Sequence, residues 1–158
     1  MAAAVWLAAG LTGAAILWSL AILTVPLEAG RSVPSISALV YGASSMVCHQ
    51  RPERSFQLGD ARLPVCARCT ALYLFGALGA VLGWVRGPRV PRHLPAILGA
   101  VSLPIVFSVA GEWTGVAGGS NALRAASAVP LGLFTGWLFV RMLRAEGWAA
   151  QMRYDSPL

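Results

Sequence analysis

Long apolar stretches dominate the hydrophobic pattern of this chain, and the polar residues gather between them. A membrane-spanning helix needs about 20 largely apolar residues. Four stretches reach or approach that length, namely residues 4–27, 70–85, 94–110 and 122–140. We expect each stretch to form a transmembrane helix, since a helix satisfies its own backbone hydrogen bonds in lipid. The pattern predicts an all-α integral membrane protein, with residues 1–158 forming a single membrane domain.

The first apolar stretch is preceded by no basic residue, and it is longer than the core of a secretory signal peptide. Signal peptides combine a positively charged start with an apolar core of about 7–15 residues. We therefore expect residues 4–27 to stay in the protein as its first transmembrane helix.

The long polar segment of the chain, residues 28–69, separates the first two apolar stretches. Its opening part, "RSVPSISALVYGASSMV", repeats apolar residues at helical spacing, and Pro34 suits a first helical turn. The repeating residues are Ile36, Leu39, Val40, Ala43, Met46 and Val47. We expect a short amphipathic helix that lies at the membrane interface or over the bundle. It leads directly to Cys48, and a turn-rich loop follows over residues 51–64.

Composition supports the membrane assignment and limits the partners. The mean hydropathy is +0.67, and only 11% of residues are charged, so lipid suits this chain better than water. The net charge of +6 is spread over the segments that flank the helices. Such a distribution suits a lipid bilayer with anionic head groups, whereas nucleic-acid binding needs a concentrated basic face. We expect the bilayer as a partner and no nucleic acid.

The arginines give a weak indication of sidedness. Short loops rich in Arg close to helix ends favour the cytoplasm. This rule places residues 86–92 and the C-terminal segment in the cytoplasm and the cysteine-containing loop outside it. Free cysteines persist most easily on the cytoplasmic face, so they favour the opposite orientation, with the cysteine-containing loop in the cytoplasm. A bound metal ion would remove that conflict.

The three cysteines of the chain stand at metal-ligand spacing. Cys66 and Cys69 form a C-x-x-C pair, and Cys48 and His49 precede it by 17–18 residues. Thiolate and imidazole ligands at such spacing are typical of zinc sites. Cu(I) and iron–sulfur clusters also take thiolates but fit this set less well. We expect zinc, held by these four residues.

Two alternatives remain open for this cluster. The side chains of the neighbours Cys48 and His49 normally diverge, so His49 either is the fourth ligand or points elsewhere. Four protein ligands indicate a structural site, and three ligands plus water a catalytic one. Cys66 and Cys69 are also spaced as a redox or disulfide pair.

A second polar group is expected on the same membrane face as the cysteines. The chain crosses the membrane twice between Cys69 and the loop "GEWTGVAGGSN", which therefore returns to that face. Glu112 and Arg124 flank this loop, and ionisable groups near hydrocarbon are costly unless paired or hydrated. They form either an ion pair, with Ser120 or Asn121 capping the last helix, or a functional set in which Glu112 moves protons and Arg124 binds an anion.

Further arginines surround the cysteines. Arg51, Arg54 and Arg68 carry guanidinium groups that suit bidentate binding of phosphate or carboxylate. The simpler interpretation is that these side chains extend to lipid phosphates.

The stretches "CHQRPERSF" and "LPVCARCTALYLFG" resemble the signature of a family of small prokaryotic membrane proteins of unknown function. The resemblance continues through "GEWTGVAGGSNALRAASAVPLGLFTG" and covers residues 47–136. The chain departs from the family pattern at Ala71, where glycine is expected, and at Glu112, where aspartate is more usual. The resemblance implies an integral protein of a prokaryotic cytoplasmic membrane with a metal site, and it implies no activity.

Three functions follow from these observations. The first is a structural or assembly subunit of a larger membrane complex, with other membrane-protein subunits as partners and a zinc-stapled loop. The second is a membrane metalloenzyme for an anionic, lipid-like substrate, with His49 or Glu112 as the candidate catalytic residue. The third is a thiol redox protein that cycles Cys66 and Cys69.

Overall fold

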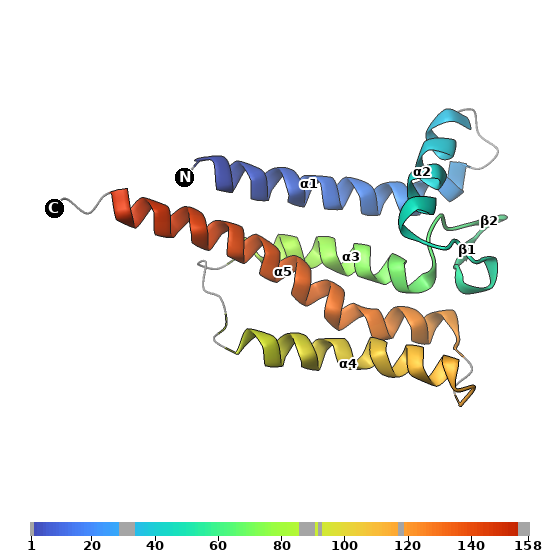
Figure 1. Cartoon of the computed structure of the whole chain (residues 1–158). Helices are drawn as coiled ribbons and strands as arrows, with labels where there is room; N and C mark the ends of the chain where they lie inside the picture. The colour runs from blue at the N-terminus through green and yellow to red at the C-terminus, as the bar shows by residue number, and fades with distance from the viewer. Residues whose placement is uncertain (1, 29–33, 86–90, 92, 117–118, 155–158) are drawn as a thin grey trace.

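A computed structural model describes residues 2–28, 34–85, 91, 93–116 and 119–154, and for residues 2, 28, 34 and 146–154 it describes the backbone alone. Over these described residues, five α-helices carry the fold, together with two short 3-10 helices (η) and a small β-hairpin (Figure 1). In chain order the elements are α1 (Ala2–Thr24), η1 (Val25–Glu28), α2 (Pro34–Val47), η2 (Pro52–Arg54), β1 (Gln57–Leu58), β2 (Ala61–Arg62), α3 (Ala67–Leu82), α4 (Leu94–Trp113) and α5 (Asn121–Tyr154).

Three segments of the described chain are long and apolar enough to cross a membrane. They are Ala3–Leu27, Leu94–Trp113 and Asn121–Ala145. The expected helix over residues 70–85 is present as α3, but it covers Ala67–Leu82 and has 16 residues. At about 1.5 Å per residue, α3 is roughly 24 Å long, which is shorter than a typical hydrocarbon core. Membrane-spanning length is thus found for three of the four expected helices.

The last helix is much longer than the apolar pattern indicated. We expected it to end near residue 140, whereas α5 continues to Tyr154. The added segment, "RMLRAEGWAAQMRY", is polar but rich in good helix formers such as Ala, Leu, Met, Arg and Glu. Hydropathy detects the part of a helix that suits lipid, so it missed this continuation.

α3 lies at the centre of the bundle and packs closely against α5. A Cβ atom on Gly79 would lie 2.0 Å from the backbone oxygen of Leu133, and one on Gly136 would lie 2.0 Å from that of Gly76. Only glycine permits these approaches, which bring the two backbones into contact as small residues do between membrane helices. α1 packs against both α3 and α5, while α4 packs against α5 (Figure 1).

The outer surface of the bundle is apolar. α4 has no buried residue, and large side chains such as Leu103, Val106 and Phe107 are at least half exposed. In water such a surface would be a liability, whereas in lipid it is the expected outer face of a spanning helix.

The expected short helix before Cys48 is present as α2. It lies across one end of the bundle, at the end of α1 farthest from the N-terminus (Figure 1). Val40 and Ser44 are buried, whereas Leu39 and Met46 are exposed. The helix therefore has one face packed on the protein and an apolar face left uncovered.

The polar loops gather at that same end. The β-hairpin follows α2, with Gln57 paired to Arg62 across a turn in which Gly59 takes a positive φ of 62°. The end of α4 and the start of α5 also lie at this end, whereas the start of α1 and the end of α5 lie at the other (Figure 1). This arrangement brings the cysteine loop and the described residues 111–116 and 119–121 to one end of the bundle, as expected from the sequence.

Candidate metal centre

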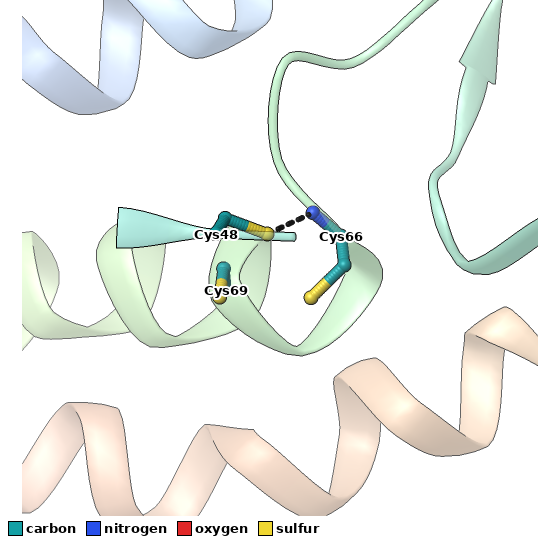
Figure 2. A group of neighbouring side chains, drawn as sticks. All are labelled: Cys48, Cys66 and Cys69. Atoms are coloured by element: carbon teal, nitrogen blue, oxygen red, sulfur yellow. Dashed lines mark hydrogen bonds between the residues drawn. The ribbon is translucent and has the colours of Figure 1, made fainter. Parts of the chain in front are cut away.

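The three cysteines converge at the start of α3. Cys48 follows α2 directly, and its N–H donates to the backbone oxygen of Ser44 (2.9 Å). Cys66 is the N-cap of α3, and Cys69 lies on its first turn. The three sulfur atoms all lie within 4.8 Å of one another (Figure 2). Sulfurs on one tetrahedral zinc ion lie about 3.8 Å apart, so the cluster has the dimensions of a metal site.

Hydrogen bonds within the cluster favour a thiolate. The Cys66 N–H donates to Sγ of Cys48 (3.2 Å; Figure 2). The hydrogen bond from the Cys69 thiol is the main reason that the pKa of Cys66 is lowered to about 5. A thiolate is the form that binds metals and reacts as a nucleophile.

An apolar layer covers one side of the cluster. Cys48 is buried with Ile22, Leu63 and Val65, and Trp18 and Tyr73 pack against this group. These residues come from α1, from the loop after the hairpin and from α3. The loop residues therefore attach the cysteines to the end of the bundle, and the layer keeps water from that side.

Gln50 holds the loop closed, a role that its position beside the cysteines in the sequence did not indicate. Its Nε2 donates to the backbone oxygens of Tyr41 (2.8 Å) and Pro64 (2.9 Å). Its backbone has a positive φ of 46°, which is uncommon for a residue other than glycine. Its place in the "CHQ" stretch was the available signal, but the two carbonyl partners are visible only in the fold.

His49 lies next to the cluster but is not part of it. Its side chain is exposed and lines the cavity described below. Among the described residues, the group with ligand atoms close enough for one ion consists of Cys48, Cys66 and Cys69.

A cavity of about 490 Å³ opens beside the cysteines. Its wall combines the cysteines with charged side chains from the loop, α3, α4 and α5. The lining residues are Val47, Cys48, His49, Arg51, Arg54, Cys66, Arg68, Cys69, Val109, Glu112, Trp113 and Arg124.

Glu112 is the negative centre of this wall. Its side chain is 8% exposed, and Oε1 accepts hydrogen bonds from Arg68 NH2 (2.5 Å) and Arg124 Nε (3.0 Å). Oε2 lies 3.9 Å from Arg54 NH2. The sequence suggested a pair with Arg124, and the structure adds Arg68 and Arg54. The contact between Arg68 and Glu112 joins residues 44 positions apart, which no local pattern reveals.

Asn121 and its neighbours hold this charged cluster in place. Asn121 accepts from Arg124 NH1 (2.9 Å) and donates to the backbone oxygen of Ser55 (3.1 Å). Ser120 caps α5 by accepting from the N–H of Leu123 (3.2 Å). Asn121 thus connects the polar loop to the start of α5.

The chain passes close to Glu112 at Gly119. A Cβ atom at residue 119 would lie 2.3 Å from Oε1 of Glu112. Glycine there lets the connection between α4 and α5 pass over the buried carboxylate.

The fold and the cluster define a small helical membrane protein with a group of thiols at one end of its bundle. Residues 48–138, more than half of the chain, match the family described as predicted membrane protein DUF2085. The chain belongs to this family, whose function is unknown, and the suspected family membership is thereby confirmed.

Two archaeal proteins are similar to this chain, and both are uncharacterized. One, from Methanocaldococcus jannaschii, is 38% identical over 57 residues, which cover 36% of this chain and 34% of that protein. The other, from Methanothermobacter thermautotrophicus, is 32% identical over 91 residues, covering 55% of this chain and 78% of that protein. The chain thus spans about a third of the first relative and most of the second. No solved structure matches the chain.

Proposed function

We propose that Cys48, Cys66 and Cys69 bind one zinc ion and that this ion fixes the polar loop to the bundle. The observation that supports the proposal is the convergence of three sulfur atoms from two distant parts of the chain to within 4.8 Å. Thiolates favour zinc, Cu(I) or iron–sulfur clusters over hard cations. Zinc suits the set best, because it needs no redox partner and accepts tetrahedral sulfur ligands.

A structural role accounts for the position of the site. The ligands come from the end of α2 and the start of α3, so an ion bound there closes the loop between them. Structural zinc supplies about 10–16 kcal/mol in small zinc-finger peptides. Such a contribution exceeds what a hairpin of two-residue strands gains on its own. The stapled loop would then serve assembly with other membrane-protein subunits.

A metalloenzyme is the second candidate, and the adjacent cavity favours it. Three cysteines leave the fourth position of a tetrahedral ion for water or substrate, which is the pattern of catalytic zinc. His49 and Glu112 line the cavity beside that position and would move protons. An anionic, lipid-like molecule is the substrate that suits the arginine-rich wall.

The fold suits a protein that crosses the membrane four times. α3 starts at the cysteine end of the bundle and runs toward the opposite end (Figure 1). α3 packs between α1 and α5. Because these neighbours cover it, its ends need not extend to the lipid head groups, and its 16 residues suffice for a crossing. We propose that the cysteine loop lies outside the cytoplasm of a prokaryotic cell and that residues 86–92, most of which lie outside the described residues, face the cytoplasm.

Metal analysis of detergent-purified protein, prepared without added metal, tests the zinc proposal. We expect about one zinc per chain in the wild type and little in Cys48→Ser or Cys69→Ser. His49→Ala is the matched control and should retain zinc, because it removes a neighbouring ligand-type side chain that lies outside the cluster. A metal-free wild type with Cys66 and Cys69 joined in a disulfide would contradict both zinc functions and favour the thiol redox protein.

A further inference from the structure

The cavity beside the cysteines carries an excess of positive charge. Four arginines line it, against the one carboxylate of Glu112. A zinc ion on three thiolates would add one negative charge, so two positive charges would still lack a partner. We propose that this cavity binds the phosphate group of an organic phosphate and that Arg51 and Arg54 are its main phosphate ligands.

Glu112 holds the two inner arginines, Arg68 and Arg124, in place but does not accept hydrogen bonds from all of their N–H donors. Its Oε1 accepts from both Arg68 and Arg124, which fixes these two guanidinium groups on the wall. Nε of Arg68 is buried and has no hydrogen-bond partner within the described part of the chain. A guanidinium carries five N–H donors, and one carboxylate cannot accept from all of those on the inner wall. The inner arginines therefore form a positive back wall that is already in position.

Arg51 and Arg54 supply the donors nearer the solvent. The Arg51 side chain is exposed, and that of Arg54 is 36% exposed. At 3.9 Å from Glu112, Arg54 lies beyond hydrogen-bond distance. In the described ranges, neither guanidinium makes a hydrogen bond to protein. Planar guanidinium groups with free donors match phosphate oxygens in pairs.

The charge and size of the cavity favour an organic phosphate over a carboxylate. A phosphate monoester carries about −1.5 to −2 charges at neutral pH, which matches the two unpaired positive charges, whereas a carboxylate would neutralise only one. A volume of about 490 Å³ lies within the usual range of small-molecule sites and exceeds the needs of phosphate alone. Val47, Val109 and Trp113 line the rest and offer apolar surface to an organic group.

Two sources of such a phosphate are compatible with the position of the cavity. It opens at the end of α4, a helix of membrane-spanning length, so either a soluble ester or a lipid head group has access. The inference goes beyond the zinc proposal. Its charge count includes the proposed zinc site, but the arginines and Glu112 are not metal ligands, and without zinc the cavity would still carry more arginines than carboxylates.

Binding measurements with two probes test the inference and separate the two sources. Glycerol 3-phosphate is titrated calorimetrically into protein in phosphatidylcholine nanodiscs, and retention of phosphatidic acid over phosphatidylcholine is measured by native mass spectrometry of delipidated protein. Binding of glycerol 3-phosphate assigns a soluble ester, and selective retention of phosphatidic acid alone assigns a lipid head group. Failure of both probes overturns the inference.

Substitutions then locate the site. Arg51→Gln and Arg54→Gln should each weaken the binding of the active probe about tenfold, the effect of losing a hydrogen bond to a charged group. Arg62→Gln is the matched control, because Arg62 is an exposed arginine of the same loop that does not line the cavity. Unchanged binding in both cavity variants, or an equal loss in the control, would overturn the assignment.

Zinc counted in the same samples separates this inference from the zinc proposal. A wild-type protein without zinc that binds either probe supports the phosphate site and contradicts the zinc site. A wild-type protein with about one zinc per chain that binds neither probe contradicts the phosphate site alone.

Discussion

Replacing Glu112 with glutamine removes the negative charge at the junction of the polar loop, α4 and α5. The carboxylate accepts hydrogen bonds from Arg68 and Arg124. Both of these arginines are largely buried, with 14% and 12% of their side chains exposed. In the variant, two positive charges would face each other across an amide that donates as well as accepts. We expect the start of α5 and the loop to separate from α4 more easily.

The expected loss of stability is about 2–3 kcal/mol. Removing one partner of a buried ion pair typically costs about 3–5 kcal/mol, because the remaining charge stays unpaired. We take a value below that range because glutamine keeps one acceptor oxygen and because the cavity admits water to Glu112. The more exposed pair with Arg54, at 3.9 Å, adds little, as surface ion pairs contribute about 0–1 kcal/mol.

Unfolding by sodium dodecyl sulfate in mixed micelles, followed by far-UV circular dichroism, measures this loss. Glu53→Gln is the matched control, because Glu53 is an exposed acid of the polar loop with no ion pair among the described residues. We expect the control to lie within about 0.5 kcal/mol of the wild type. If Glu112→Gln is as stable as Glu53→Gln, the buried charge cluster does not hold the loop as argued.

Three further predictions concern packing, thiol chemistry and loop attachment. Gly79→Ala should lower the unfolding free energy by about 1–3 kcal/mol, because the helices must move apart. Gly99→Ala, with open space around its Cβ position, should not lower it in the same detergent-unfolding assay. In metal-free protein, Cys66 should be alkylated rapidly at pH 7. The alkylation rate and the stability of the protein should both fall only as the pH drops through the lowered pKa of Cys66, about 5. A half-maximal rate near pH 8.5, the value of an ordinary thiol, measured by peptide mapping, would refute this. Asn121→Ala should cost about 1–2 kcal/mol through the lost hydrogen bonds to the loop and to Arg124, and an unchanged melting temperature would contradict that role.

The apolar pattern located the helices well and their ends poorly. Hydropathy marks the part of a helix that suits lipid, so α4 was found within a few residues, and the polar turns of α5 beyond residue 140 were missed. α3 begins earlier than expected because its first turn is built from the C-x-x-C segment itself, with Cys66 as the N-cap in extended conformation. Because α3 starts at Ala67, Cys66 and Cys69 both lie at its N-terminal end.

The candidate site could be anticipated in outline because topology limits which loops meet. The two crossings expected between Cys69 and Glu112 predicted that both polar segments lie on one face, and the structure brings them to a common cavity. The detailed partners could not be anticipated, since Arg68 reaches Glu112 from another helix and Gln50 closes the loop through backbone oxygens. Such contacts depend on how helices are rotated, which residue spacing does not specify.

Zinc K-edge X-ray absorption spectroscopy of the purified protein shows which atoms surround the metal ion. A site built from Cys48, Cys66 and Cys69 predicts three sulfur neighbours at about 2.3 Å and one lighter atom at about 2.0–2.1 Å. The spectrum should be unchanged in His49→Ala if water or substrate holds the fourth position. A shell of nitrogen and oxygen atoms alone would contradict the claim that the three cysteines hold the metal.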